Sequence, residues 1–280
     1  MTNIVDDFDL NNKYKLYRNL YEILHPTISK KNISDYKIVL DDSLMPIRVF
    51  YPKKVSLINS FIIYIHGNGD VTGCRGFYSS VCEEMAKKTN KLILAIDYNF
   101  DVDNSFDTLF NSCYELVSFL YERGVEFGIE QKNIAVMGDS FGASLAVAIA
   151  NKALEQEDFR IEKEILLYPI LNDNYKEYKG SNKALIARVE EFYKDIDISD
   201  NLMSSYLFPL KKMEYKNMPH TLIVTGNIDC FKEDGVSYFN LLDDKNSKYF
   251  NIDFLEHGFL NNSDKESLEQ LYLEIRNFLM

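Results

Sequence analysis

The sequence predicts an α/β fold, with about eight strands in a mostly parallel sheet and helices on both faces. Three observations carry this prediction. Short apolar runs, typical of buried strands, alternate along the chain with amphipathic stretches typical of helices. Several of the runs are apolar throughout, as in parallel strands that are covered on both faces. No repeat, linker or low-complexity tract divides the 280 residues, so we expect a single domain.

The predicted elements follow this alternation in chain order. Residues 10–24 form an apolar stripe of helical spacing that ends before Pro26, and this first helix is either an edge decoration or part of a lid. Residues 37–40 and 47–51 are expected to pair as antiparallel strands around a polar turn with Pro46. The remaining predicted strands are residues 60–65, 92–96, 134–137, 165–169, 221–225 and 249–255.

The predicted helices begin near Phe77, Phe106, Ala143, Gly226 and Ser263. Residues 172–217 break the alternation, because they are polar, rich in tyrosine and carry one helical stripe of Leu185, Val189 and Phe192. We interpret this segment as an insertion within the same domain.

Charge and cysteine content exclude several classes of function. A net charge of −12 argues against nucleic acid and anionic membrane surfaces as partners. No apolar run approaches the ~20 residues that span a bilayer, and residues 1–9 lack the basic start of a secretory signal. The four cysteines lack the spacing of metal sites and are interpreted as reduced thiols, which predicts a cytoplasmic protein without stable membrane insertion.

A Gly-x-Ser-x-Gly motif lies where a buried strand meets a helix rich in small residues. The motif runs from Gly138 to Gly142, with Ser140 at its centre. A sharp turn at this point would bring strand and helix so close that side chains at 138 and 142 would clash. The turn would also force Ser140 into a strained conformation that lifts its hydroxyl clear of the sheet. Ser140 is therefore the candidate nucleophile.

A serine nucleophile needs a base, and the chain has four histidines from which to choose. His25 precedes every predicted strand, and His66 lies in a glycine-rich loop whose backbone geometry explains it better. His220 opens a strand at its amino end, whereas His257 follows the last strand, at the carboxyl rim where such sheets bind ligands. Elimination selects His257 as the base.

The base in turn needs a carboxylate to orient its ring. Asp229 follows the strand at 221–225, at the same rim, and lies between serine and histidine in chain order. Glu233 and Asp234 are weaker candidates, because they fall inside the following helix and are expected to turn away from the rim. A helix N-cap is the alternative interpretation of Asp229.

The reaction would create an oxyanion, which requires preorganised N–H donors. The predicted donors are the backbone N–H groups of Phe141, after the nucleophile, and of Gly67, Asn68 and Gly69 in the glycine-rich loop. Asp139, beside the serine, is expected to anchor neighbouring backbone and not to act as an acid.

Together these motifs resemble the hormone-sensitive-lipase family of esterases. The resemblance rests on His66-Gly67-Asn68-Gly69, Asp97-Tyr98, Gly138-Asp139-Ser140-Phe141-Gly142, Leu222 to Gly226 with Asp229, and His257-Gly258-Phe259. It implies an α/β-hydrolase fold, a small helical lid built from about residues 1–30 and 172–217, and hydrolysis of carboxylic esters without a metal or organic cofactor. Two departures stand out: Asn68 replaces a usual glycine, and Phe141 replaces a usual alanine, which should narrow the acyl side of the pocket.

The sequence therefore predicts a cytoplasmic serine esterase that acts on small to medium acyl esters through Ser140, His257 and Asp229. The expected partner is a small-molecule acyl ester, and a homodimer is left open. An amidase, thioesterase or peptidase on the same triad remains an alternative. A protein that binds a ligand without catalysis is a further alternative, favoured only by Asn68 and Phe141.

Overall fold

The computed structural model describes most of the chain, in segments. The described residues are 28–30, 32–40, 44–53, 61–67, 77–98, 105–123, 134–174, 178, 182–194, 196–211, 215–242, 245, 247–262 and 265–280. The predicted helix at 10–24 lies outside these residues, as do His25, Asn68, Gly69 and Cys74.

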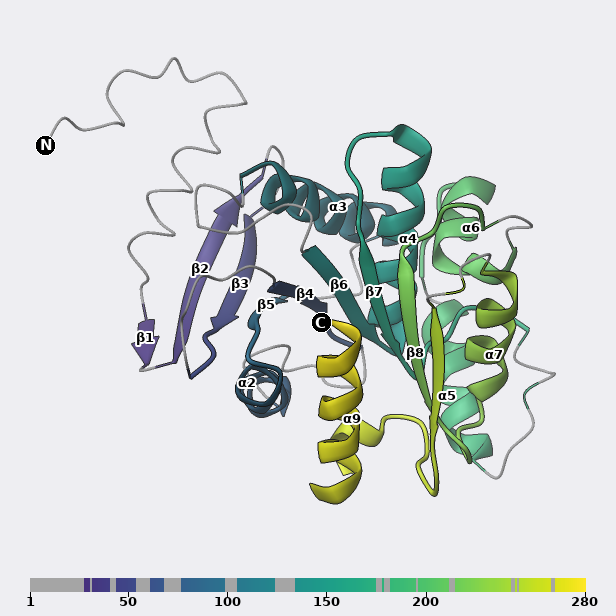
Figure 1. The fold of residues 1–280 in the computed structure, drawn as a ribbon. Helices are drawn as coiled ribbons and strands as arrows, with labels where there is room; N and C mark the ends of the chain where they lie inside the picture. Colours follow the sequence, from purple (N-terminus) through teal and green to yellow (C-terminus); the bar gives the residue numbers. More distant parts are fainter. Residues whose placement is uncertain are drawn as a thin grey trace, which may run out of the picture.

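A single twisted sheet runs through the molecule (Figure 1). In the described part of the chain it has nine strands in the order β1-β2-β3-β5-β4-β6-β7-β8-β9. Strands β1 to β3 are antiparallel, β3 joins β5 antiparallel, and every later pairing from β5 to β9 is parallel. The strands are β1 Ile28–Lys30, β2 Ile33–Val39, β3 Leu44–Phe50, β4 Phe61–Ile65, β5 Leu92–Ile96, β6 Ile134–Asp139, β7 Lys163–Leu167, β8 His220–Gly226 and β9 Lys248–Ile252. The predicted α/β-hydrolase fold is confirmed.

Helices cover both faces of the sheet because its central strands are apolar on both sides (Figure 1). Helices α2 (Phe77–Thr89) and α9 (Lys265–Phe278) share one core with Ile62 and Tyr64 of β4. Helices α3 (Phe106–Arg123) and α4 (Phe141–Gln156) share the other core with the alternate residues of β4, Phe61, Ile63 and Ile65. Two further helices, α7 (Lys232–Leu241) and the short α8 (Phe259–Asn262), connect β8 to β9 and β9 to α9.

The antiparallel end of the sheet differs from the prediction in two details. Pro46 lies inside β3, opposite Lys37, so the predicted turn at Pro46 is wrong. Pro46 precedes the part of β3 that pairs with β5, and its carbonyl accepts the N–H of Asp97 at 2.9 Å. The other difference is β1, a three-residue strand that pairs with β2 and was not expected.

Between β7 and β8 the described chain adds a small group of helices, one beside the nucleophile turn and one packed against α4. It contains α5 (Lys183–Lys194), α6 (Asn201–Leu207) and a short 3₁₀ turn, η5 (Pro209–Lys211). Its second half is fixed to the domain, since Tyr206 Oη donates to Glu155 of α4 at 2.6 Å. We call residues 172–217 the cap. Among the described residues, no helix has the length and apolar character needed to cross a membrane.

Candidate active site

Ser140 occupies the tight turn between β6 and α4. Its backbone has φ 53° and ψ −120°, a conformation that side chains rarely adopt. A methyl group on Gly142 would lie well under 3.0 Å from the carbonyl oxygen of Ile65, and one on Gly138 equally close to Gly142. Both glycines are therefore required for the close approach of strand and helix, as the sequence predicted, and the turn raises the serine hydroxyl above the sheet.

Two further chain segments bring a histidine and a carboxylate to this serine. Ser140 Oγ lies 3.0 Å from His257 Nε2, and His257 Nδ1 lies 3.2 Å from Asp229 Oδ2. The second carboxylate oxygen accepts the N–H of Phe231 at 2.8 Å, and the Asp229 side chain is fully buried. The three predicted residues thus form one chain of hydrogen bonds, in the order that nucleophilic catalysis requires.

The loops that carry Asp229 and His257 are held to each other beyond the ends of β8 and β9. The N–H of Asn227 donates to Ile252 at 3.0 Å, and the N–H of Ile228 donates to Leu255 at 3.3 Å. These bonds extend the parallel pairing of the two strands past their last residues. The carboxylate and the imidazole consequently face each other although 28 residues separate them.

Aromatic rings fix the orientation of the imidazole. Tyr168 and Phe231 both meet the His257 ring edge to face, with centroids 5.0 and 4.9 Å away. Such contacts leave the ring little freedom to rotate while its two nitrogens remain bonded to Ser140 and Asp229.

Asp139, next to the serine, is buried and accepts hydrogen bonds from four groups. Tyr64 Oη (2.6 Å) and the Gly67 N–H (2.8 Å) donate to Oδ1, while Tyr78 Oη (3.0 Å) and Tyr168 Oη (2.9 Å) donate to Oδ2. Burial raises the pKa of Asp139, and the donated bonds oppose that shift. Asp139 therefore ties the loop after β4 to the nucleophile turn, which agrees with its expected role as a backbone anchor.

This anchor changes the list of oxyanion donors. Because the Gly67 N–H is bonded to Asp139 Oδ1 at 2.8 Å, it does not point at an oxyanion in this conformation. Asn68 and Gly69 lie outside the described residues, and Phe141 is the first residue of α4, directly after the nucleophile. The predicted donor Gly67 is thus better described as the residue that holds the start of the oxyanion loop.

The other described histidines lie elsewhere, as elimination required. His66 is buried, stacks on Tyr98 with ring centroids 4.1 Å apart, and has its Nδ1 2.8 Å from the Gly67 carbonyl oxygen. His220 begins β8, at the opposite end of the strand from Asp229. Neither is bonded to Ser140.

Asp234 has a role that the sequence did not reveal. Its Oδ2 accepts the N–H groups of Leu171 (2.7 Å) and Asn172 (3.1 Å) and the hydroxyl of Tyr178 (2.8 Å). Burial raises its pKa to about 7. The Asp234 side chain therefore holds the start of the cap by hydrogen bonds, although it is not bonded to His257. No sequence signal identifies it, because these partners come from a segment some sixty residues earlier.

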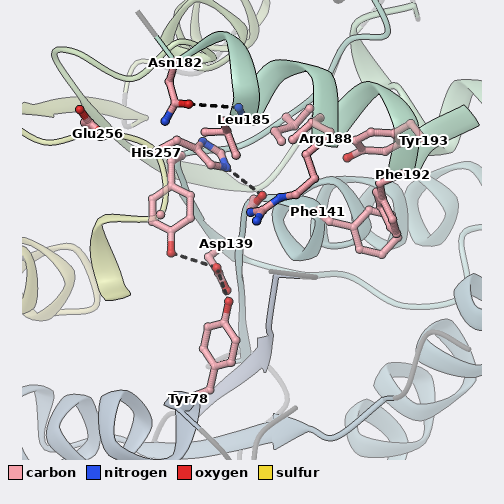
Figure 2. A pocket seen from close by; sticks show the side chains of 15 residues that line it. Tyr78, Asp139, Phe141, Asn182, Leu185, Arg188, Phe192, Tyr193, Glu256 and His257 are labelled. Carbon is pink, nitrogen blue, oxygen red and sulfur yellow. Dashed lines mark hydrogen bonds between the residues drawn. The ribbon is translucent and has the colours of Figure 1, made fainter. Parts of the chain in front are cut away.

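A cavity of about 460 Å³ lies above the serine, between the sheet and the cap (Figure 2). One wall is aromatic: Phe141 meets Phe192 edge to face at 5.4 Å and Tyr193 at 6.0 Å. Leu185 and Arg188 of α5 line the cavity as well, and Glu256 lies at its other side (Figure 2). Phe141, which the sequence predicted to narrow the acyl side of the pocket, is buried beside the nucleophile and forms part of this wall.

The cysteines and acids of the described residues offer no metal centre. Within that part of the chain, no group of three or more His, Cys, Asp or Glu side chains is placed to hold a metal ion. Cys82, Cys113 and Cys230 are buried free thiols, and burial raises the pKa of Cys113 and Cys230 to about 12.

Comparison with known proteins identifies the family. A family model for the alpha/beta hydrolase fold matches residues 62–261. The chain belongs to this family. It is similar to an ethyl acetate hydrolase of Pseudomonas putida (24% identity, covering 74% of this chain and 68% of the relative). It is also similar to an arylesterase of Saccharolobus solfataricus (21% identity, covering 84% of this chain and 79% of the relative).

Solved structures agree on the fold of this hydrolase. An esterase from Pyrobaculum calidifontis superposes with a TM-score of 0.76 at 20% identity, over 98% of this chain and 91% of the other. A carboxylesterase called EstE1 gives a TM-score of 0.75 at 19% identity, over 96% of each chain. Together with the family match, these relatives confirm the resemblance to hormone-sensitive-lipase-like esterases.

Proposed function

We propose that this hydrolase cleaves carboxylic esters of small to medium acyl chains through an acyl-enzyme on Ser140. The observation that carries the proposal is the chain of hydrogen bonds from Ser140 Oγ to His257 Nε2 (3.0 Å) and from His257 Nδ1 to Asp229 Oδ2 (3.2 Å). A serine hydroxyl is a weak nucleophile until an oriented base accepts its proton. This geometry supplies both the base and the group that orients it.

In the first half of the reaction, Ser140 Oγ attacks the ester carbonyl carbon while His257 Nε2 takes the hydroxyl proton. The electron pair of the carbonyl bond moves to oxygen. The resulting oxyanion would accept hydrogen bonds from the backbone N–H groups of Phe141, Asn68 and Gly69. Collapse of the intermediate breaks the bond to the alcohol oxygen, which leaves with the proton from His257.

In the second half, water attacks the acyl-enzyme and gives a proton to His257. The new tetrahedral intermediate expels Ser140 Oγ, which recovers its proton, and the carboxylic acid departs. Asp229 accepts the hydrogen bond of His257 in both halves and stabilises the imidazolium that forms each time. Its full burial keeps water from competing for that interaction.

Two findings support the limit on acyl size. The cavity of about 460 Å³ is closed on one side by Phe141, Phe192 and Tyr193, whose rings pack against one another. One relative is named for the hydrolysis of ethyl acetate, which has a short acyl chain. We therefore expect acetate and butyrate esters to be cleaved faster than long-chain esters.

The direct test is the Ser140→Ala variant with 4-nitrophenyl butyrate. Removal of the nucleophile should lower kcat by about 10⁴-fold or more and leave the unfolding temperature within a few degrees of the parent value. Ser205→Ala on α6, outside the cavity, is the matched control and should keep full activity. A Ser140→Ala variant with parent activity would refute the assignment.

The same three residues would also cleave amides, thioesters and peptides. Assays with the butyryl amide and thioester of matched leaving groups distinguish these alternatives, and we expect the ester to have the largest kcat/KM. Turnover of any of them would refute the non-catalytic binding protein. The cytoplasmic location, the lid contribution of residues 1–30 and a homodimer stay predictions.

A further inference from the structure

One helix of the cap presents a charged residue to the cavity from an otherwise apolar stripe. Leu185, Val189 and Phe192 line the cavity at helical spacings i, i+4 and i+7 of α5. Arg188 lies at i+3, on the same face, and also lines the cavity. Figure 2 shows its side chain reaching from α5 into the pocket, between His257 and Phe141.

The guanidinium of Arg188 has no ion pair or hydrogen bond with any residue that the structure describes. Two other cations of the cap are paired: Lys194, on the same helix, bonds Glu190 at 2.7 Å, and Lys211 bonds Asp173 at 2.6 Å. Arg188 is exposed and borders the catalytic cavity, so its guanidinium is available to a ligand bound there.

The carboxylates that border the cavity do not neutralise Arg188. Asp139 is buried below the serine and is occupied by three tyrosine hydroxyls and the Gly67 N–H. Glu256 is exposed and lies on the far side of His257 from Arg188 in Figure 2. Among the described residues lining the cavity, Arg188 is the only lysine or arginine.

We propose that Arg188 binds a carboxylate on the ester substrate, so that the enzyme prefers acidic esters over neutral ones of equal length. The inference rests on the proposed esterase function and names the substrate class for the same site. A planar guanidinium matches a carboxylate with two parallel hydrogen bonds. A singly charged carboxylate also suits an acidic protein better than a doubly charged phosphate, because the overall field repels anions.

The carboxylate could belong to the acyl half or to the alcohol half of the ester, and two assay arms distinguish them. The acyl arm compares mono-4-nitrophenyl adipate with neutral 4-nitrophenyl hexanoate. The alcohol arm compares 4-acetoxybenzoate with its neutral methyl ester. Each arm is run at pH 7 with the parent enzyme, Arg188→Gln, Arg188→Lys and the control Lys194→Gln, which removes a positive charge from the same helix outside the cavity.

We expect Arg188→Gln to lower kcat/KM for the acidic ester of one arm by about 10- to 100-fold and to change the neutral ester by less than about 2-fold. Arg188→Lys should retain part of the preference, Lys194→Gln should retain all of it, and added salt should reduce it. A decrease that is equal for acidic and neutral esters, or no decrease in either arm, would overturn the role of Arg188. If the parent enzyme cleaves neither the acidic nor the neutral esters, the proposed function itself fails, and this inference falls with it.

Discussion

The carboxyl rim of the sheet and helix α5 of the cap are held in very different ways. At the rim, Ser140 sits in a turn closed by two glycines, Asp139 accepts four hydrogen bonds, and Asp229 is fully buried. In the cap, Tyr193 is the one residue of α5 that is buried among those whose side chains are described, and Arg188 is exposed.

We infer from this difference that the residues of the rim carry out the reaction, whereas the residues of α5 select the substrate. Groups that must meet within about 3 Å of one another are placed on the ends of strands whose backbones are bonded to their neighbours. Groups that contact the rest of the substrate lie on a helix with few fixed contacts, where substitutions cost little stability. Variants at the rim should therefore lose stability or kcat, whereas variants on α5 should change the choice of substrate.

The largest difference is expected between Gly142→Ala at the rim and Ala184→Gly on the exposed face of α5. The added methyl group would collide with the Ile65 and His66 backbone, so strand and helix must move apart. We expect Gly142→Ala to lower the free energy of unfolding by about 3 kcal/mol or more, and Ala184→Gly to lower it by about 1 kcal/mol. Urea unfolding measures both, and equal losses would contradict the contrast.

A smaller effect is expected from Asp139→Asn. The amide of the variant keeps one oxygen to accept the Gly67 N–H. Its NH₂ group, however, would face the hydroxyls of Tyr78 and Tyr168, which in the parent donate hydrogen bonds to the carboxylate. The oxyanion loop should shift slightly, so kcat for 4-nitrophenyl butyrate should fall about 10-fold with little change in KM. Tyr78→Phe, which removes one donor and leaves the carboxylate, should lower kcat less. A rise in KM alone would indicate that Asp139 acts on binding and not on the loop.

The smallest effect concerns Asp234, which joins the two regions. Burial raises its pKa from the usual 3.8 to about 7, so the folded state holds a proton that the unfolded state releases. This group's contribution to stability is full below about pH 4 and is lost as the pH rises through 7, because the folded carboxyl must then ionise while buried. Between pH 6 and 7 the loss should be about 1 kcal/mol.

Asp234→Asn should remove that part of the pH dependence, and the exposed Asp253→Asn should leave it unchanged. The measurement is the free energy of unfolding by urea at pH 6 and pH 7. A parent enzyme and an Asp234→Asn variant with the same pH dependence would show that the carboxyl ionises as freely in the fold as in the unfolded chain.

The sequence predicted the rim better than the cap, for a physical reason. Ser140 follows from a local pattern of strand, glycines and helix, and His257 and Asp229 follow from the rule that parallel strands end at one rim. The use of the Gly67 N–H by Asp139 could not be predicted, because it depends on how closely two loops approach in space.

Contacts between distant segments explain the other differences. Asp234 bonds backbone groups of a preceding loop, and nothing in its own helix indicates this. β1 is three residues long, too short for a hydrophobic period to be visible. The position of Arg188 could have been found in the sequence, because it lies three residues after Leu185, on the same helix face as Val189 and Phe192. A search for apolar residues at helical spacing does not select a charged residue on that face.

The most direct test of the central claim is covalent labelling of the folded protein by a fluorophosphonate, which reacts only with a serine activated by its own base. Intact mass and peptide sequencing should give one phosphonyl group per chain, on Ser140, with labelling lost in both Ser140→Ala and His257→Ala. Labelling that persists in Ser140→Ala, or no labelling of a protein shown to be folded, would contradict the triad of Ser140, His257 and Asp229.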